Sequence, residues 1–350
     1  MQTRQALLTN LTNAVQQNCH IADALYAGDY TLCIYLLKMR ELYRWEQNKA
    51  FSTNLSNETV GNWLRKREAL WDELESSDYQ HLPLNNQTIP PFESSLMNNA
   101  LAQHQLVYSA GMGLNNRPHF FLGELEHFEK HGDYSLYIAG KEYARDMSAP
   151  PAMSHNKTIY IRKESFQRFL WEQLETWRWN KPDNALGRAF ACYGCDDSLD
   201  KALIEMTDTE IDNVIQHERG EIEAGVLLGD KWQALLFSLP YSKATLMLRA
   251  IRDHLADSLT TLPFLLETNS APSWHFYFGN LNNMRKDLYP ELKHAYDIWY
   301  ETGSLSKMEQ TISRGKQHWL TLCQDVLRIN ESDIKLQQTK IENLIEQQRL

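Results

Sequence analysis

The segment 118–131 carries a carboxylate and two imidazoles at helical spacing: Glu124, His127 and His131 follow one another at offsets of three and four. Residues three or four apart lie above one another on an α-helix. The three side chains would therefore share the flank of an apolar face and could converge on one cation. We predict that this segment is a helix that offers ligands to a metal ion.

Two other segments place ionisable groups on faces that packing alone would make apolar. Glu218 falls in the middle of an apolar helical stripe, with Glu221 three residues further on. His254 projects onto the core face of a later helix, and Asp257 follows it at the same offset. A buried carboxylate is costly to desolvate without a cation or a hydrogen-bond donor beside it. Both pairs are therefore candidate metal ligands.

A fourth helix, predicted over residues 30–50, directs Glu46 into its apolar face and Glu41 toward solvent. Oxygen and imidazole ligands without thiolates suit iron or manganese. The candidate metal ligands from all four helices are Glu46, Glu124, His127, His131, Glu218, Glu221, His254 and Asp257.

This ligand set resembles that of the ferritin-like and haem-oxygenase-like families with carboxylate-bridged metals, in which inward-facing helices supply a Glu and a Glu-x-x-His. The resemblance is architectural and covers about four helices. It implies a non-haem iron or manganese centre inside a helical bundle. The sequence departs from the pattern because only Glu124 and His127 form the motif in the proposed core, whereas His254 and Asp257 run in the reverse order.

The first hypothesis for function is an oxidase or oxygenase that acts on a small molecule at this metal centre. Carboxylates and imidazoles divide between direct ligands, bridging carboxylates and groups that orient the ligands. The direct ligands would be Glu124, His127, Glu218 and His254. Glu46 and Glu221 would be terminal or bridging carboxylates. His131 and Asp257 would be either ligands or groups that orient the ligands. No other catalytic residue is assigned.

The alternative hypothesis is a non-catalytic interaction or scaffold protein in which the same inward charges form buried salt bridges. Several arginines are available as partners, namely Arg44, Arg145, Arg188, Arg249 and Arg252. In this interpretation the last helix, rich in Gln and Glu, docks a protein partner or a second copy of the chain.

Helical periodicity recurs along the chain and predicts an all-α fold, a multi-helix bundle of one continuous domain or of two packed halves, 1–147 and 156–350. The adjacent prolines in 148–155 cannot lie in a helix and suggest the boundary. Residues 158–161 could form one short strand, but no matching strand is evident, so we predict no sheet. The predicted helices cover residues 3–26, 30–50, 57–76, 93–110, 118–131, 134–146, 162–179, 199–228, 242–261, 281–302, 305–328 and 331–349.

The overall charge argues against some classes of partner. Lys and Arg total 35 against 45 Asp and Glu, a formal net charge of −10. Such a chain is not expected to bind nucleic acid or anionic membranes through charge, so a small molecule or a protein is the expected partner. No export signal or membrane-spanning run is evident, which suggests a cytoplasmic protein. The five cysteines do not suggest a disulfide framework, and the role of Cys192 and Cys195, spaced as in redox and zinc motifs, stays open.

Overall fold

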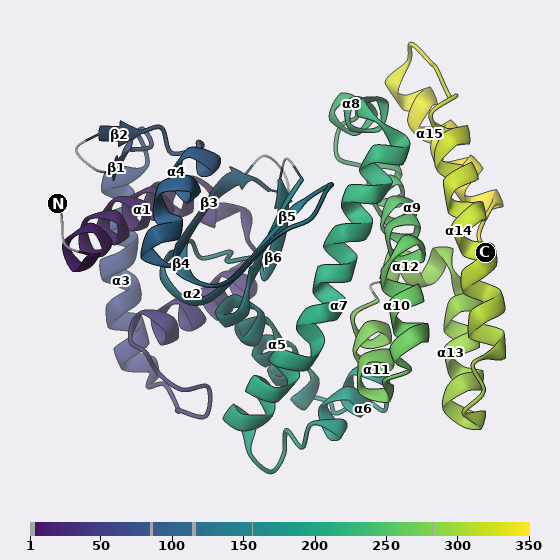
Figure 1. The fold of residues 1–350 in the computed structure, drawn as a ribbon, viewed down its shortest axis with the longest axis horizontal. Helices are drawn as coiled ribbons and strands as arrows, with labels where there is room; N and C mark the ends of the chain where they lie inside the picture. Colours follow the sequence, from purple (N-terminus) through teal and green to yellow (C-terminus); the bar gives the residue numbers. More distant parts are fainter. Residues whose placement is uncertain (1–3, 85–86, 114–116, 156, 282) are drawn as a thin grey trace. The chain divides into compact units, whose positions relative to one another are not determined.

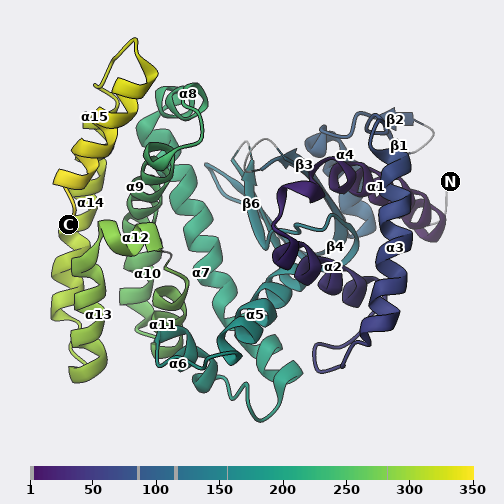
Figure 2. The same ribbon diagram turned by 180° about the vertical axis from the view of Figure 1, so that it is seen from behind.

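In the computed structural model, the chain folds into two compact units (Figures 1 and 2). The N-terminal unit comprises Met1–Thr176 and Cys195–Asp208, and the C-terminal unit comprises Trp177–Gly194 and Thr209–Leu350. The structure describes residues 4–84, 87–113, 117–155, 157–281 and 283–350. Among these residues, no helix combines the length and the apolar character that crossing a membrane requires.

The N-terminal unit contains both helices and strands. Its helices are α1 (Arg4–Tyr26), the short 3-10 helix η1 (Ala27–Asp29), α2 (Leu32–Glu46), α3 (Asn57–Leu74), α4 (Ser94–Leu101), the 3-10 helix η2 (Ala102–His104) and α5 (Lys163–Arg178). Its strands are β1 (Leu82–Leu84), β2 (Gln87–Ile89), β3 (Leu106–Met112), β4 (Pro118–Lys130), β5 (Ser135–Arg145), β6 (Ala152–His155) and β7 (Thr158–Arg162). The first ten residues of α7 (Leu199–Leu228) complete this unit.

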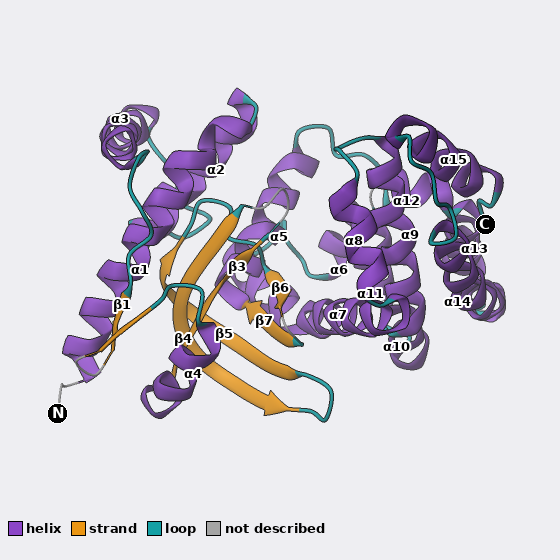
Figure 3. Cartoon of the chain, turned by 90° about the horizontal axis from the view of Figure 1, so that it is seen from above, coloured by secondary structure: helices purple, strands orange, loops and turns teal. Residues whose placement is uncertain are grey.

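Five of the strands form one mixed sheet in the order β3-β4-β5-β7-β6. Among the described strands, only the β5–β7 pair is parallel, and β1 and β2 form a separate antiparallel pair. Figure 3 shows the long strands β4 and β5 curving strongly. The register between β4 and β5 shifts around Gly123 and Leu125, and such irregularities bend a strand. At Gly123 a Cβ would lie 3.2 Å from the carbonyl oxygen of Lys141, so the absence of a side chain permits the close approach of β5.

The predicted all-α fold class is therefore wrong, and the protein combines a mixed sheet with many helices. The predicted helices 118–131 and 134–146 are the strands β4 and β5, and the end of the predicted helix 93–110 is strand β3. Phe, Tyr and Gly, which these segments contain, favour strands or permit tight strand pairing, and pairing with distant segments overrides the local helical spacing. Residues 158–161, for which a short strand without an evident partner was considered, lie in β7, which pairs with β5 and β6. The prediction of no sheet is therefore wrong.

Helix α1 packs against the sheet through a stripe of apolar residues at helical spacing. Leu7, Leu11, Val15 and Cys19 are 2% exposed or less and share one core with strand residues of β3 and β4. Alternation along β3 gives its two sides different neighbours. Tyr108 faces the α1 core, whereas residue Val107 joins a second cluster on the other side of the sheet.

The described part of the C-terminal unit contains helices only. They are α6 (Ala185–Cys192), the remainder of α7, α8 (Asp230–Ser238), α9 (Lys243–Leu259), α10 (Thr261–Thr268), α11 (Ala271–Asn280), α12 (Asn283–Leu288), α13 (Pro290–Thr302), α14 (Ser306–Val326) and α15 (Ile334–Gln347). Helix α9 lies at the centre of the core, where Leu248 and Ile251 are fully buried together with Trp319 of α14 and Ile341 of α15. Figures 1 and 2 show α9, α14 and α15 running side by side.

Candidate ligand-binding site

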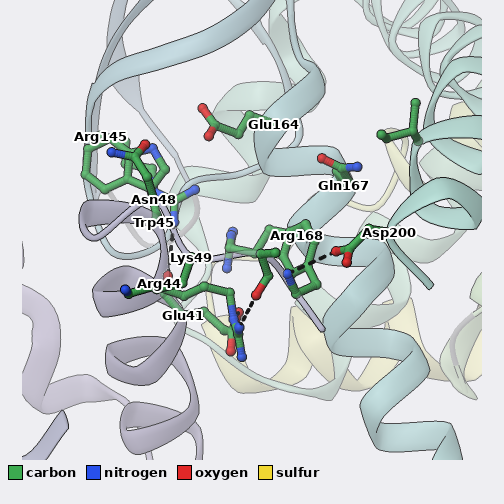
Figure 4. Close-up of a pocket in the computed structure, with 13 residues that line it drawn as sticks. Glu41, Arg44, Trp45, Asn48, Lys49, Arg145, Glu164, Gln167, Arg168 and Asp200 are labelled. Carbon is green, nitrogen blue, oxygen red and sulfur yellow. Dashed lines mark hydrogen bonds and ion pairs between the residues drawn. The ribbon is translucent and has the colours of Figure 1, made fainter. Parts of the chain in front are cut away.

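The N-terminal unit contains a cavity of about 460 Å³. Its wall comes from the end of α2 and the loop that follows, the last residue of β5, the start of α5 and the first turns of α7. Figure 4 shows polar side chains from these elements around the space, with Glu164 and Gln167 on one side of the view and Glu41 and Arg44 on the other. Cavities of this size accommodate small molecules.

One side of the cavity is held in place by Arg44. Its Nε donates to Glu41 at 3.0 Å, and its Nη1 donates to the carbonyl oxygens of Ala50 and Thr53 at 2.6 and 3.0 Å. Asp200 fixes the same loop from α7 by accepting a hydrogen bond from the backbone N–H of Phe51 at 3.1 Å. These bonds fix the loop after α2, so Arg44 has a structural role here.

Arg145, at the end of β5, is a buried and incompletely paired cation of the cavity. Its side chain is only 2% exposed and stacks on Trp45, with the guanidinium carbon 4.6 Å from the ring centre. Its contacts with oxygen are long: 3.4 Å from Nη2 to the Glu41 carbonyl and 3.9 Å from Nη1 to Glu142. The Nε atom is buried and has no hydrogen-bond partner among the described residues. Burial and the positive charge of Arg168 lower the pKa of Arg145 to about 10.

The carboxylate nearest to Arg145 is already committed to another arginine. Glu142 accepts bonds from Nε and Nη2 of Arg162 at 3.0 and 2.6 Å and from the hydroxyl of Ser165 at 2.6 Å. This bidentate pairing with Arg162, and the charge of Arg145, lower the pKa of Glu142 against the effect of burial. Glu142 therefore has little capacity left to neutralise Arg145.

The two other basic residues of the cavity differ from each other. Arg168 is occupied, because it pairs with Glu172 at 2.5 Å and donates to the carbonyl oxygens of Ser148 and Ala149. Lys49 is exposed, and its ammonium forms no ion pair or hydrogen bond with the described part of the chain. Arg145 and Lys49 thus remain able to bind an anion.

Two carboxyl groups also face this space. Burial, and then the negative charge of Glu142, raise the pKa of Glu164, although its Oε2 accepts the backbone N–H of Glu142 at 2.6 Å. Burial likewise raises the pKa of Glu41, which is 5% exposed. The prediction that Glu41 is solvated is therefore wrong. The buried residues of α2 lie in its C-terminal half, some beside the cavity and others in an apolar cluster, whereas two leucines of the expected apolar face, Leu32 and Leu36, are exposed.

Glu46 was predicted to face the protein interior, and this prediction is wrong. It is exposed and pairs with Arg67, and it also accepts a bond from the Trp63 indole at 3.2 Å. Both Glu46 and Arg67 line a second cavity of about 390 Å³, which shares Trp45 with the first.

The three candidate ligands of the segment 118–131 lie along β4 and just after it. On a strand, successive side chains alternate between faces, so an offset of three does not place two side chains one above the other as it does on a helix. Glu124 is half-buried, whereas His127 is exposed and lies 3.6 Å from Glu129. His131 lies 3.3 Å from the same carboxylate and stacks on Tyr134.

The other four candidates lie in the C-terminal unit, and Asp257 is the centre of their surroundings. Its buried carboxylate accepts bonds from Tyr277 at 2.8 Å and from Arg285, and it pairs with His217 at 2.8 Å. The pairing with Asp257 raises the pKa of His217 to about 10 despite the partial burial of the imidazole, and Arg285 and His217 in turn lower the pKa of Asp257.

His254, Glu218 and Glu221 complete that set. His254 is fully buried, directs Nε2 to the carbonyl oxygen of Arg285 at 2.9 Å and stacks on Trp319; burial lowers its pKa to about 3. Glu218 is buried on α7, and Glu221 pairs with Arg252 at 3.4 Å.

The predicted metal-binding centre is therefore a wrong prediction. In the part of the chain that the structure describes, no group of three or more His, Cys, Asp or Glu side chains could hold a metal ion. The physical reason is twofold. The Glu-x-x-His segment is a strand, and the inward carboxylates Glu221 and Asp257 already have arginine partners.

Most residues that line the cavity were not predicted from the sequence, among them Lys49, Glu164 and Gln167, and Arg145 was considered only as a salt-bridge partner. A signal for Arg145 existed, because a charged residue ends a segment that is otherwise rich in strand-forming residues. Without the sheet, that signal could not be connected to the distant helices α2 and α5.

Comparison with known proteins adds the family. No curated protein and no solved structure matches the chain. Residues 10–162 match the N-terminal domain, and residues 167–348 the C-terminal domain, of a family of unknown function, DUF6866. The two matches together span most of the chain. The protein therefore belongs to the DUF6866 family.

Proposed function

We propose that the N-terminal unit binds a small molecule with an anionic group, a carboxylate or a phosphate, in the 460 Å³ cavity. The observation that carries this proposal is Arg145, a buried guanidinium whose Nε has no partner among the described residues. A buried charge is costly unless it is paired, and an anion beside Arg145 would supply the missing hydrogen bonds. The exposed ammonium of Lys49 could bind the same anion.

The test is isothermal titration calorimetry of the full chain with inorganic phosphate and with 3-phenylpropanoate. We expect at least one of the two anions to bind, and Arg145→Met to weaken that binding by about tenfold or more, because hydrogen bonds to a charged group contribute about 1.5–3 kcal/mol. Arg65→Met is the matched control, since Arg65 is exposed on α3 and does not line the cavity. It should change the affinity by less than about twofold.

Two outcomes would overturn the proposal. The first is the absence of binding of either anion to the wild-type protein. The second is equal binding by wild-type protein and Arg145→Met, which would place the anion elsewhere on the surface.

A second candidate function is an interaction or scaffold role, in which the helix α15 docks a protein partner or a second copy of the chain. It is favoured by the C-terminal unit, where Asp257 and Glu221 are neutralised by side chains of the protein itself. A scaffold of this kind predicts no binding of small anions, so the same titration separates the two candidates.

For either function we propose a cytoplasmic location. The five cysteines are all free thiols, which is their usual state in a reducing compartment.

A further inference from the structure

The cavity of the N-terminal unit presents charges of both signs to the same space. Arg145 comes from β5 and Glu164 from α5, and both line the wall. They form no ion pair with each other, and Glu164 has no Lys or Arg partner among the described residues. Figure 4 shows the Glu164 carboxyl group and the Arg145 side chain as separate groups at the cavity. Glu164 therefore has no direct counter-ion, and Arg145 has only the long contact of 3.9 Å with Glu142.

Glu142 lies next to Arg145 and is a buried carboxylate that other side chains of the unit neutralise. Glu142 is 3% exposed and is held by Arg162 and Ser165. Glu164 instead accepts hydrogen bonds from the backbone N–H of Glu142 and from the Trp45 side chain, which orient its carboxyl group but add no positive charge. The opposite shifts of pKa agree with this contrast, since the pKa of Glu142 is lowered and that of Glu164 is raised.

The remaining wall of the cavity is partly apolar. Trp45, Phe51 and Ile204 contribute their side chains to it. A ligand that interacts with all these parts of the wall thus needs an anionic group to pair with Arg145, a cationic group to pair with Glu164 and an apolar portion. Binding sites of this kind select orientation with a few polar groups and gain affinity from the apolar surface.

We propose that the ligand is a zwitterion, an amino acid or a related small molecule, whose carboxylate pairs with Arg145 and whose ammonium pairs with Glu164. This inference rests on the proposed function, because it adds a second charge to the anion already placed at Arg145. The ammonium bound to Glu164 supplies the counter-ion that the chain omits there, and the side chain of the amino acid lies against the aromatic residues.

The experiment compares three probes of nearly the same shape by isothermal titration calorimetry with the full chain. The twenty protein amino acids are first ranked in the same assay, and the tightest binder is compared with its carboxylate-only and amine-only analogues. For phenylalanine, these analogues are 3-phenylpropanoate and 2-phenylethylamine. We expect the amino acid to bind at least tenfold more tightly than either analogue.

Two variants assign the charges. Glu164→Gln should weaken binding of the amino acid by about tenfold and change the affinity for the carboxylate-only analogue by less than about twofold. Arg145→Met should weaken binding of both probes. Glu73→Gln is the control, since Glu73 is an exposed carboxylate of α3 away from the cavity. It should change neither affinity.

The outcomes separate this inference from the proposed function. If the carboxylate-only analogue or phosphate binds as tightly as every amino acid, the zwitterion is refuted while the anion site at Arg145 stands. The zwitterion is also refuted if Glu164→Gln weakens binding of the amino acid and of the carboxylate-only analogue equally. If no amino acid, carboxylate or phosphate binds, the proposed function itself fails.

Discussion

The two units differ in how completely their buried charged side chains are paired within the protein. In the C-terminal unit, Asp257 is surrounded by His217, Tyr277 and Arg285, so its charge is neutralised within the protein. In the N-terminal unit, Arg145 and Glu164 are largely buried but line a cavity without pairing to each other. A closed network of this kind stabilises one conformation, whereas incompletely paired charges at a cavity favour a ligand. Inward charge alone therefore does not distinguish a structural network from a binding site; the difference lies in whether the partners come from the chain.

The largest expected effect is that of Asp257→Ala, which removes the centre of the closed network. The variant should lose about 3–5 kcal/mol of unfolding free energy, because it leaves the partly buried cations His217 and Arg285 without the buried carboxylate that they share. Urea unfolding of the full chain measures this loss. The control is Asp287→Ala, at an exposed carboxylate of α12, which should cost less than about 0.5 kcal/mol. A loss below 1 kcal/mol for Asp257→Ala would mean that the network does not stabilise the unit.

The second prediction concerns pH. The pKa of His217 is raised to about 10 in the folded protein, against an ordinary value of 6.5, so folding is favoured by its protonated form. The stabilisation is fully present below pH 6.5 and is lost as the pH rises from 6.5 to 10. We expect a loss on the order of 2 kcal/mol, less than the full shift because the His217 side chain is 31% exposed. Urea unfolding at pH 6 and pH 9.5 measures it.

His217→Gln provides the control for that titration. The variant should be less stable than the wild type at pH 6, and the difference between the two proteins should shrink toward pH 9.5. If both proteins lose the same stability between these pH values, the histidine does not carry the effect.

The smallest effect is expected for Arg145→Met in the protein without ligand. Because this guanidinium is buried and only partly paired, replacing it with an apolar side chain of similar length should leave the unfolding free energy unchanged or raise it by about 1 kcal/mol. Differential scanning calorimetry or urea unfolding in a buffer without phosphate and carboxylates gives the value. A loss of more than about 2 kcal/mol would instead make Arg145 a structural residue like Asp257 and remove the contrast between the units.

The sequence predicted the C-terminal unit better than the N-terminal one, for a physical reason. The helix predicted at 199–228 has the bounds of α7, and His254 and Asp257 are fully buried, as the helical projection predicted. Helical faces depend on residues a few positions apart, so a local pattern suffices. Strand pairing between β4 and β5, or β5 and β7, depends on contacts between separate segments, and the local spacing of Glu124 and His127 suggested a helix instead.

Within α2, the helix itself was predicted but the orientation of its charges was not. Glu46 was placed inside and Glu41 outside, and the structure reverses both. A helical projection assumes that burial follows the apolar stripe along the whole helix. Here the C-terminal half of α2 is buried on one side by an apolar cluster that contains Met39 and Leu42, and on another by the residues around a polar cavity. No pattern within α2 could reveal the second side, because α5 and α7 help to build it.

The path of the chain through the units has a practical consequence for dissecting the protein. The stretch Cys195–Asp208 returns to the N-terminal unit after the chain has entered the other one. A fragment ended at residue 162, where the match to the N-terminal family domain stops, would retain Arg145 but lack Glu164 and the Asp200 bond that fixes the loop at Phe51. Recombinant pieces designed on the family boundary would therefore be unsuitable for affinity measurements, and ligand screening belongs with the intact polypeptide.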